Sequence, residues 1–157
     1  PSSFRLLVVD NEAAHARAMM ESLEKVGYRC TVATSGPEAA TLIARDTYDI
    51  VITDMVMNDV DGMKVLGLAR KHLPDAEVVM VTGHATVPIA VEAMQKGAFN
   101  FLEKPITPNR LRAIVEKAAG AVDLRRQNTV LMSRLDKQYG FESIIYSSKE
   151  MQEVIDR

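Results

Sequence analysis

Five short runs of strand-forming residues alternate along the chain with segments of helical periodicity. The runs span residues 4–9, 29–33, 50–54, 77–81 and 99–102. The segments between them repeat apolar residues at intervals of three and four, which is the spacing of an amphipathic helix. Regular alternation of strands and helices predicts a parallel sheet that is covered by helices on both faces.

The strands differ in how apolar they are, and this difference predicts their order. The runs at 4–9, 50–54 and 77–81 are largely apolar, whereas 29–33 and 99–102 mix apolar and polar residues. Fully buried strands belong at the centre of a sheet, and mixed strands belong at its edges. The pattern predicts a doubly wound α/β fold with the flavodoxin-like strand order 2-1-3-4-5. It disfavours the dinucleotide-binding order 3-2-1-4-5, in which the third strand is an edge.

Local motifs place the ends of several helices. Residues 35–38 have a capping-box pattern with proline in the first turn. Gly27 and Gly97 are placed to end two helices in the left-handed conformation. Thr107 followed by Pro108 predicts the start of a final helix.

Composition excludes several classes of function. A formal net charge of -2 gives no field strong enough to favour nucleic acid or anionic lipid, so we expect this segment to bind neither. No apolar run approaches the roughly 20 residues of a membrane-spanning helix. The single cysteine, Cys30, excludes an intrachain disulfide and is expected to pack within a strand. A cytoplasmic location follows most simply from this cysteine usage.

Polar residues follow the ends of four predicted strands: Asp10-Asn11, Asp54, Thr82 and Lys104. Taken singly, such residues are ordinarily turn formers, helix caps or surface charges. All four, however, fall on the carboxyl edge of one sheet, where ligands bind in open α/β folds. The switch point of the predicted order lies between the strands that end in Asp10 and Asp54. The coincidence favours a functional site.

The chemistry of this set is coherent. Two neighbouring carboxylates repel each other, and a hard divalent cation such as Mg²⁺ relieves the repulsion through oxygen ligands. Asp54 can act as the nucleophile that forms an acyl phosphate. The metal would neutralise charge on the transferring phosphoryl group. The Lys104 ammonium and the Thr82 hydroxyl would hold the remaining phosphoryl oxygens.

These residues make the chain closely resemble the receiver domain of two-component response regulators, over about residues 4–121. The matching residues are Val8-Val9-Asp10, Asp54, Thr82-Gly83, Phe101 and Lys104-Pro105. The resemblance implies a CheY-like fold and a phosphoryl group accepted on Asp54 from a cognate sensor histidine kinase in the presence of Mg²⁺.

The resemblance also implies roles for individual residues. It assigns the metal to Asp10, Asn11, Asp54 and the backbone carbonyl of Val56. It implies that Thr82 shifts toward the phosphoryl group and that Phe101 is an aromatic rotamer switch. It implies a cis peptide bond before Pro105, and a reporting surface formed by the fourth helix, fifth strand and fifth helix.

Two departures from the family pattern carry expectations. Asn11 stands where the family usually has a second acid, so we expect weaker Mg²⁺ affinity unless Glu12 or Asp10 compensates. Met57-Asn58 stands where a proline is common, which loosens the loop but removes no chemistry. The side chain of Val56 cannot hydrogen-bond an attacking water, so we expect slow autodephosphorylation.

The chain continues beyond the receiver-like region as a predicted helix from Pro108 to about Lys137. A second apolar stripe contains Leu124, Asn128, Leu131 and Leu135. A long amphipathic helix on its own domain is one interpretation. Beyond Ala121, however, the stripe needs a partner, and a short coiled coil that makes a homodimer, with Asn128 fixing the register, fits it. The predicted linker spans residues 122–138.

The last residues carry a second, shorter resemblance. Tyr139-Gly140 is predicted to end the helix, and residues 141–148 and 151–154 resemble the start of the AAA+ ATPase domain of NtrC/DctD-type activators. Tyr146 stands where a glycine is usual, so an unrelated tail helix is the alternative. The resemblance implies that 139–157 is a truncated start of this domain in a larger activator, which works with sigma-54 RNA polymerase and DNA. No G-x-x-x-x-G-K-[ST] motif occurs, so these residues have no P-loop for ATP.

These residues leave three candidate functions. The first is a phosphorylation switch in which the dimer arrangement controls a downstream ATPase. The second is a degenerate receiver that acts as a constitutive dimerisation module, favoured only by Asn11. The third is an aspartate-nucleophile phosphatase, which usually carries a second aspartate where Val56 stands. We therefore expect no enzyme, only self-phosphorylation on Asp54 and slow self-dephosphorylation. His84 lies on the active edge and can touch the phosphoryl group or remain a solvated loop residue.

Overall fold

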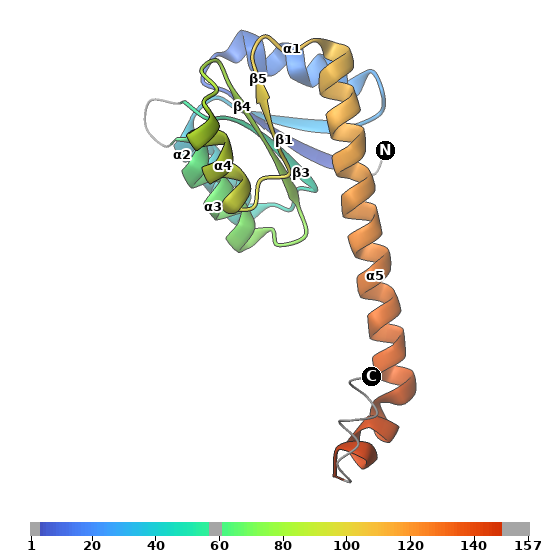
Figure 1. Ribbon diagram of the computed structural model, residues 1–157. Coiled ribbons are helices and arrows are strands. Elements are labelled where there is room, and N and C mark those ends of the chain that lie inside the picture. Colours follow the sequence, from blue (N-terminus) through green and yellow to red (C-terminus); the bar gives the residue numbers. More distant parts are fainter. Residues whose placement is uncertain (1–3, 57–60, 149–157) are drawn as a thin grey trace. The chain divides into compact units, whose positions relative to one another are not determined.

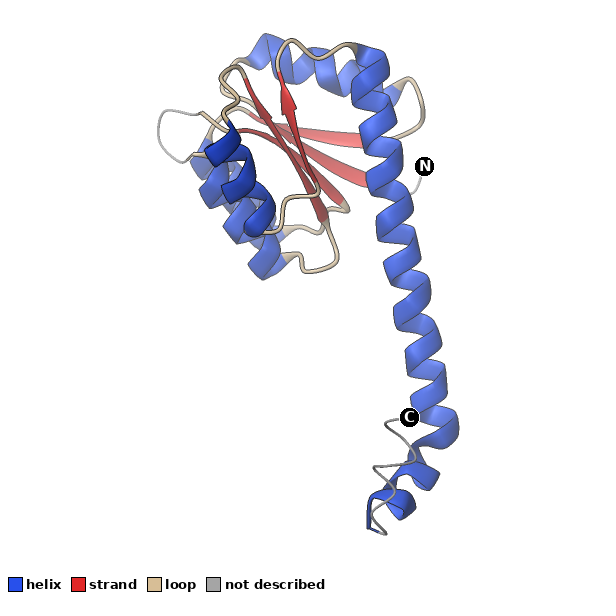
Figure 2. Cartoon of the chain, in the orientation of Figure 1, coloured by secondary structure: helices blue, strands red, loops and turns tan. Residues whose placement is uncertain are grey.

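The predicted five-stranded parallel sheet is confirmed, and its order is β2-β1-β3-β4-β5. The computed structural model describes residues 4–56 and 61–148, with side chains through residue 135. All strand pairs are parallel, and Figure 2 draws the strands of this sheet in red. The strands are β1 (Arg5–Val9), β2 (Arg29–Ala33), β3 (Ile50–Asp54), β4 (Glu77–Thr82) and β5 (Asn100–Glu103).

Helices cover both faces of this sheet (Figure 1). They are α1 (Ala13–Glu24), α2 (Gly36–Arg45), α3 (Gly62–His72), α4 (Val87–Gln95) and α5 (Pro108–Ser148). One core cluster joins the sheet to α2, α3 and α4, and the other joins it to α1 and the first turns of α5. Every residue of β3 and β4 is buried, which agrees with their central positions. Cys30 packs against the second cluster, where burial and the nearby Glu24 raise the pKa of its thiol to about 12.

The predicted helix ends agree with the hydrogen bonds at these positions. The Ser35 hydroxyl oxygen accepts from the Glu38 N–H at 3.1 Å, so Ser35 caps α2. The Glu38 carboxylate accepts from the N–H of Thr34, one residue earlier than in the usual capping box. Gly27 and Gly97 both have a φ of 101°, a conformation that glycine adopts without strain.

The register brings the predicted polar residues to one edge. It pairs residues near the ends of neighbouring strands: Val9 with Thr53, Asp54 with Val81, and Thr82 with Glu103. Asp10 and Lys104 come directly after β1 and β5. Their backbone N–H groups continue the ladder, because Asp10 donates to the Ala33 carbonyl and Lys104 donates to the Thr82 carbonyl. The carboxyl edge of the sheet is therefore a rigid frame for their side chains.

The chain divides into two compact units, Pro1–Val122 and Asp123–Arg157. The predicted end of the last helix at Tyr139-Gly140 is wrong, because α5 continues to Ser148. A glycine inside a helix costs only about 1 kcal/mol relative to alanine and is not a stop in itself. Residues 151–154 and the Met57-Asn58 position lie outside the described residues. The boundaries 4–121, 122–138 and 139–157 remain predictions. Among the described helices, none is long and apolar enough to cross a membrane.

Two exposed glycines inside helices should be sites where the fold can be stabilised. A methyl group added at Gly67 in α3 or Gly120 in α5 meets no atom within 4 Å. Alanine loses less backbone entropy on folding, so Gly67→Ala and Gly120→Ala should each raise the free energy of unfolding by about 0.5–1 kcal/mol. Thermal denaturation followed by circular dichroism should show a rise of roughly 2–4 °C per kcal/mol. A lower melting temperature would mean that another group occupies the space beside the glycine.

Candidate functional site

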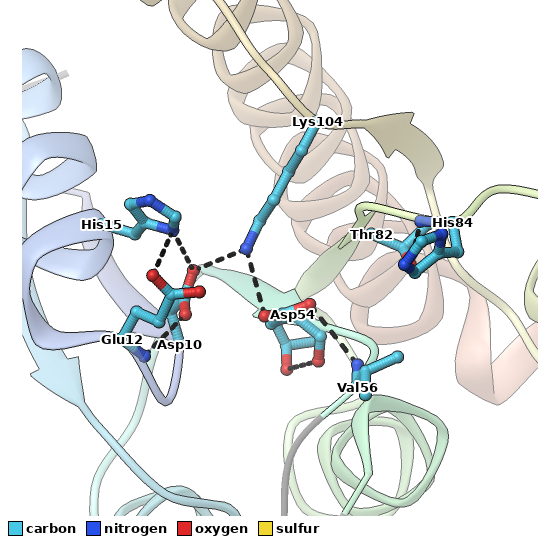
Figure 3. Close-up of polar contacts among 9 residues, drawn as sticks. Asp10, Glu12, His15, Asp54, Val56, Thr82, His84 and Lys104 are labelled. Carbon is cyan, nitrogen blue, oxygen red and sulfur yellow. Dashed lines mark hydrogen bonds and ion pairs between the residues drawn. The ribbon is translucent and has the colours of Figure 1, made fainter.

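A single ammonium group joins the two carboxylates at the end of the central strands. Nζ of Lys104 donates to Oδ2 of Asp10 at 3.0 Å and to Oδ2 of Asp54 at 3.1 Å (Figure 3). The side chains are 21%, 0% and 9% exposed, respectively. Charges that are largely withdrawn from water interact strongly. The site therefore carries two negative charges that are held together by one positive charge.

The two carboxylates change the titration of Lys104. Burial lowers the pKa of the ammonium, but the hydrogen bonds and charges of Asp10 and Asp54 outweigh it and raise the pKa above its ordinary value of 10.5. A group whose pKa is higher in the folded protein than in the unfolded chain stabilises the fold. The stabilisation is complete when the pH is below the pKa of the unfolded chain. This contribution is lost as the pH rises above about 10.5 and through the raised value.

Each carboxylate is also held by the backbone of its own loop. Oδ1 of Asp10 accepts from the N–H of Glu12 at 2.9 Å, and Oδ1 of Asp54 accepts from the N–H of Val56 at 3.4 Å. Val56 is 63% exposed, and Asn11 is exposed beside Asp10. These contacts orient both carboxylates toward the same space at the edge of the sheet.

Thr82 lies one strand beyond Asp54 and is buried. Its hydroxyl oxygen accepts from the backbone N–H of His84 at 3.2 Å (Figure 3). The hydroxyl hydrogen is then available for an acceptor in the site. His84 itself is exposed, and its backbone, not its ring, makes this contact. The arrangement thus places a neutral donor at the end of β4, the strand next to that of Asp54.

The oxygen donors suit a hard divalent cation. Among the described residues, no three histidine, cysteine or acidic side chains are grouped to hold a metal. Mg²⁺, however, commonly binds proteins through one or two carboxylates and keeps several waters. Asp10 and Asp54 provide that number, and the Asn11 amide and Val56 carbonyl provide neutral oxygens next to them in the chain. These residues fit Mg²⁺, which would supply positive charge to a phosphoryl group at this edge.

The family to which the chain belongs follows from its similarity to known proteins. Residues 6–116 match the family of the response regulator receiver domain. The chain belongs to this family. Its fold and its strand order are therefore those of a receiver domain.

The receiver domain is similar to the first part of longer regulators. The alginate biosynthesis transcriptional regulatory protein AlgB of Pseudomonas aeruginosa is 39% identical over 113 residues, which are 72% of this chain and 25% of AlgB. The transcriptional regulatory protein GlrR of Escherichia coli is 33% identical over an alignment of 142 residues that covers 85% of this chain and 32% of GlrR. The chain thus spans about a quarter to a third of the length of these curated relatives.

Solved structures agree with the fold. The receiver domain of a putative LuxO repressor protein from Vibrio parahaemolyticus superimposes with a TM-score of 0.75 and 28% identity, covering 79% of this chain and 95% of that one. NtrX from Brucella abortus superimposes with a TM-score of 0.76 and 29% identity, covering 82% of this chain and 30% of NtrX.

The predicted switch residues have distinct positions in the receiver domain. Phe101 is half-buried on β5 and packs against the cluster that includes α3 and α4. The Lys104–Pro105 peptide bond is cis, as the resemblance implies. Pro105 lines a cavity of about 380 Å³ beside the site. The other lining residues are Asp10, His15, Ala18, Met19, Val81, Lys104 and Ile106.

His15 was not predicted to lie near the site. Its Nδ1 is 3.5 Å from Oε2 of Glu12 and 3.9 Å from Oδ2 of Asp10 (Figure 3). One indication in the sequence is that His15 lies in the first turn of the helix after Asp10. Residues three apart on a helix are neighbours, so His15 lies beside Glu12 and near the end of β1.

The predicted linker residues lie in the second unit, on the part of α5 beyond Val122. Leu124, Leu131 and Leu135 are 66%, 54% and 49% exposed, and Asn128 is exposed as well. Val130 and Met132 are also about half exposed, and they lie outside the predicted stripe. The apolar surface is therefore broader than the sequence spacing predicted.

Proposed function

We propose that this receiver domain accepts a phosphoryl group on Asp54 from a cognate sensor histidine kinase and that Mg²⁺ is required. The observation that carries the proposal is the double hydrogen bond of Lys104 to Asp10 and Asp54. It holds one nearly buried carboxylate beside a second carboxylate and a fixed cation. This cluster of two acids and one base lies at the edge where ligands bind in a doubly wound sheet.

The reaction follows from these positions. An Asp54 carboxylate oxygen attacks phosphorus, a P–O bond forms, and the P–N bond to the donor imidazole breaks. Lys104 and the Thr82 hydroxyl then donate to phosphoryl oxygens, as preformed groups that need little reorganisation. Bound Mg²⁺ would neutralise charge on the phosphoryl oxygens. Asp10 keeps Lys104 in place and offers the metal a carboxylate.

The test is the intact mass of the protein after incubation with acetyl phosphate and Mg²⁺. We expect a single phosphoryl adduct on the native chain and none on Asp54→Asn, because the amide is a far weaker nucleophile. Without Mg²⁺ the adduct should not accumulate. No adduct at saturating Mg²⁺ would favour the degenerate receiver, for which Asn11 is the one supporting feature.

The adduct should decay slowly once the donor is removed. Val56 follows Asp54 by two residues and is exposed, but its isopropyl group offers no hydrogen bond to an attacking water. The chain should therefore hydrolyse only its own phosphoryl group, over times much longer than seconds. A lifetime of seconds would contradict this part of the proposal.

The longer relatives support a place for the domain in transcriptional control. In the full protein, located in the cytoplasm, a change in dimer arrangement would control a sigma-54-activating ATPase and so act on RNA polymerase and DNA. The exposed leucines of the second unit support a homodimer, because an apolar stripe of this length on a helix ordinarily packs against a partner.

Sedimentation equilibrium tests the homodimer. The native chain should dimerise, and Leu131→Lys should raise the dimer dissociation constant at least tenfold (about 1.4 kcal/mol), because it places a charge in the apolar stripe. Thr129→Lys introduces the same charge on an exposed position of the same helix and should change the constant little. A monomeric native chain would remove the homodimer from the proposal.

A further inference from the structure

The start of α3 lies against the backbone of the phosphoacceptor strand. A methyl group built at Gly62 would overlap the carbonyl oxygen of Asp54 and would lie 2.6 Å from Cα of Met55. The N–H of Gly62 donates to the Met55 carbonyl at 2.8 Å. The first residue of the helix is therefore in direct backbone contact with the residues that end β3.

The strand side of this contact cannot move away easily. Asp54 is paired with Val81 of β4, and the N–H of Met55 donates to the Val81 carbonyl at 2.7 Å. The Asp54 carbonyl also accepts from the Thr53 hydroxyl at 3.0 Å. Asp54 and Met55 are both buried.

The helix side is held as firmly. The Asp61 carboxylate caps α3 by accepting from the N–H of Lys64 at 3.0 Å. Val65, Leu66 and Ala69 of the same helix are fully buried against the sheet. Both sides of the contact are therefore anchored, so a side chain at position 62 can be accommodated only by straining the Asp54–Val56 turn that lies against the start of α3.

We infer that Gly62 is a positioning residue for the phosphoacceptor site, an inference that rests on the proposed function. By lacking a side chain it lets the Asp54–Val56 turn close, so that Oδ1 of Asp54 meets the Val56 N–H and the Val56 carbonyl keeps its place at the metal position. Its backbone φ is not in the left-handed region. The requirement at this position is space, not conformation.

The expected result of Gly62→Ala follows from the overlap. Restoring ordinary contact needs a displacement of about 1 Å in the Asp54–Val56 turn. A misplacement of that size can slow a reaction about a hundredfold. We therefore expect the phosphorylation rate at saturating acetyl phosphate and Mg²⁺ to fall by roughly tenfold to a hundredfold. The dissociation constant for Mg²⁺, measured by calorimetry without a phosphodonor, should rise severalfold.

Gly67→Ala is the matched control, because it makes the same substitution in the same helix where no atom lies within 4 Å. It should leave both the phosphorylation rate and the Mg²⁺ constant within twofold of the native values. If Gly62→Ala behaves like this control, the inference is overturned. If the native chain itself takes no phosphoryl group, the proposed function fails, and the calorimetric comparison still tests the positioning of the metal ligands.

Gly62→Ala can also impair folding. The same substitution is then made in the Gly67→Ala/Gly120→Ala background, which should be more stable. A folded variant that has lost Mg²⁺ affinity and phosphorylation rate supports the inference. A variant that still does not fold would overturn it, because Gly62 would then serve the stability of the whole domain and not the geometry of the site.

Discussion

Lys104→Met should lower the free energy of unfolding by about 2–4 kcal/mol when no Mg²⁺ is present. The ammonium is the cation that both Asp10 and Asp54 contact, at 3.0 and 3.1 Å. Methionine keeps most of the side-chain volume but leaves two nearly buried carboxylates facing each other without compensation. Breaking a fully buried pair is more destabilising still, but Lys104 is 21% exposed, so water moderates the effect.

Mg²⁺ should restore part of the free energy of unfolding that Lys104→Met loses. A ligand that binds only the native state stabilises it according to its concentration and affinity. The net charge of the three groups changes from -1 to -2 when the ammonium is removed, so the variant should bind the cation more tightly than the native chain. Urea denaturation at several Mg²⁺ concentrations should therefore show a larger metal-dependent gain for Lys104→Met.

Lys117→Met changes an exposed lysine of α5 and should alter stability by no more than about 0.5 kcal/mol. A Lys104→Met variant as stable as this control would show that the ammonium does not hold the carboxylates together. If Mg²⁺ raises the free energy of unfolding equally in the native and variant chains, the metal binds away from the cluster of Lys104, Asp10 and Asp54.

The sheet order could be predicted from the sequence because the apolar content of each strand indicates how deeply the strand is buried. Residues 50–54 and 77–81 are largely apolar and lie at the centre, whereas the mixed β2 and β5 lie at the edges. Helix ends were predictable for a similar reason, since caps such as Ser35 and Thr107 act within three residues.

Contacts between segments that are distant in the chain were harder to predict from the sequence. Lys104 is 94 residues from Asp10 and 50 from Asp54 in the chain, so the sequence placed them on one edge without showing that a single Nζ bonds both. The overlap between the Gly62 position and the Asp54 carbonyl depends on how closely α3 approaches β3, which side-chain periodicity does not encode. The helix continued past Gly140 because a local preference of about 1 kcal/mol does not decide the end of a helix.

Asn11→Asp should tighten Mg²⁺ binding by about tenfold or more, which corresponds to about 1.4 kcal/mol. Asn11 directly follows Asp10 and is exposed at the carboxyl edge of β1. The substitution adds a full negative charge beside two carboxylates that already share one ammonium. A divalent cation gains from each added carboxylate ligand, whereas an amide oxygen contributes no charge.

The same substitution should destabilise the domain when Mg²⁺ is absent, because three carboxylates then repel one another around Lys104. Affinity and metal-free stability must therefore change in opposite directions, which calorimetry and urea denaturation measure separately. Gln127→Glu adds the same charge at an exposed position inside α5, in the second unit, and should change neither quantity appreciably. If Asn11→Asp leaves Mg²⁺ affinity unchanged, the side chain at position 11 is not a metal ligand, and Asp10, Asp54 and the Val56 carbonyl would have to hold the cation without it.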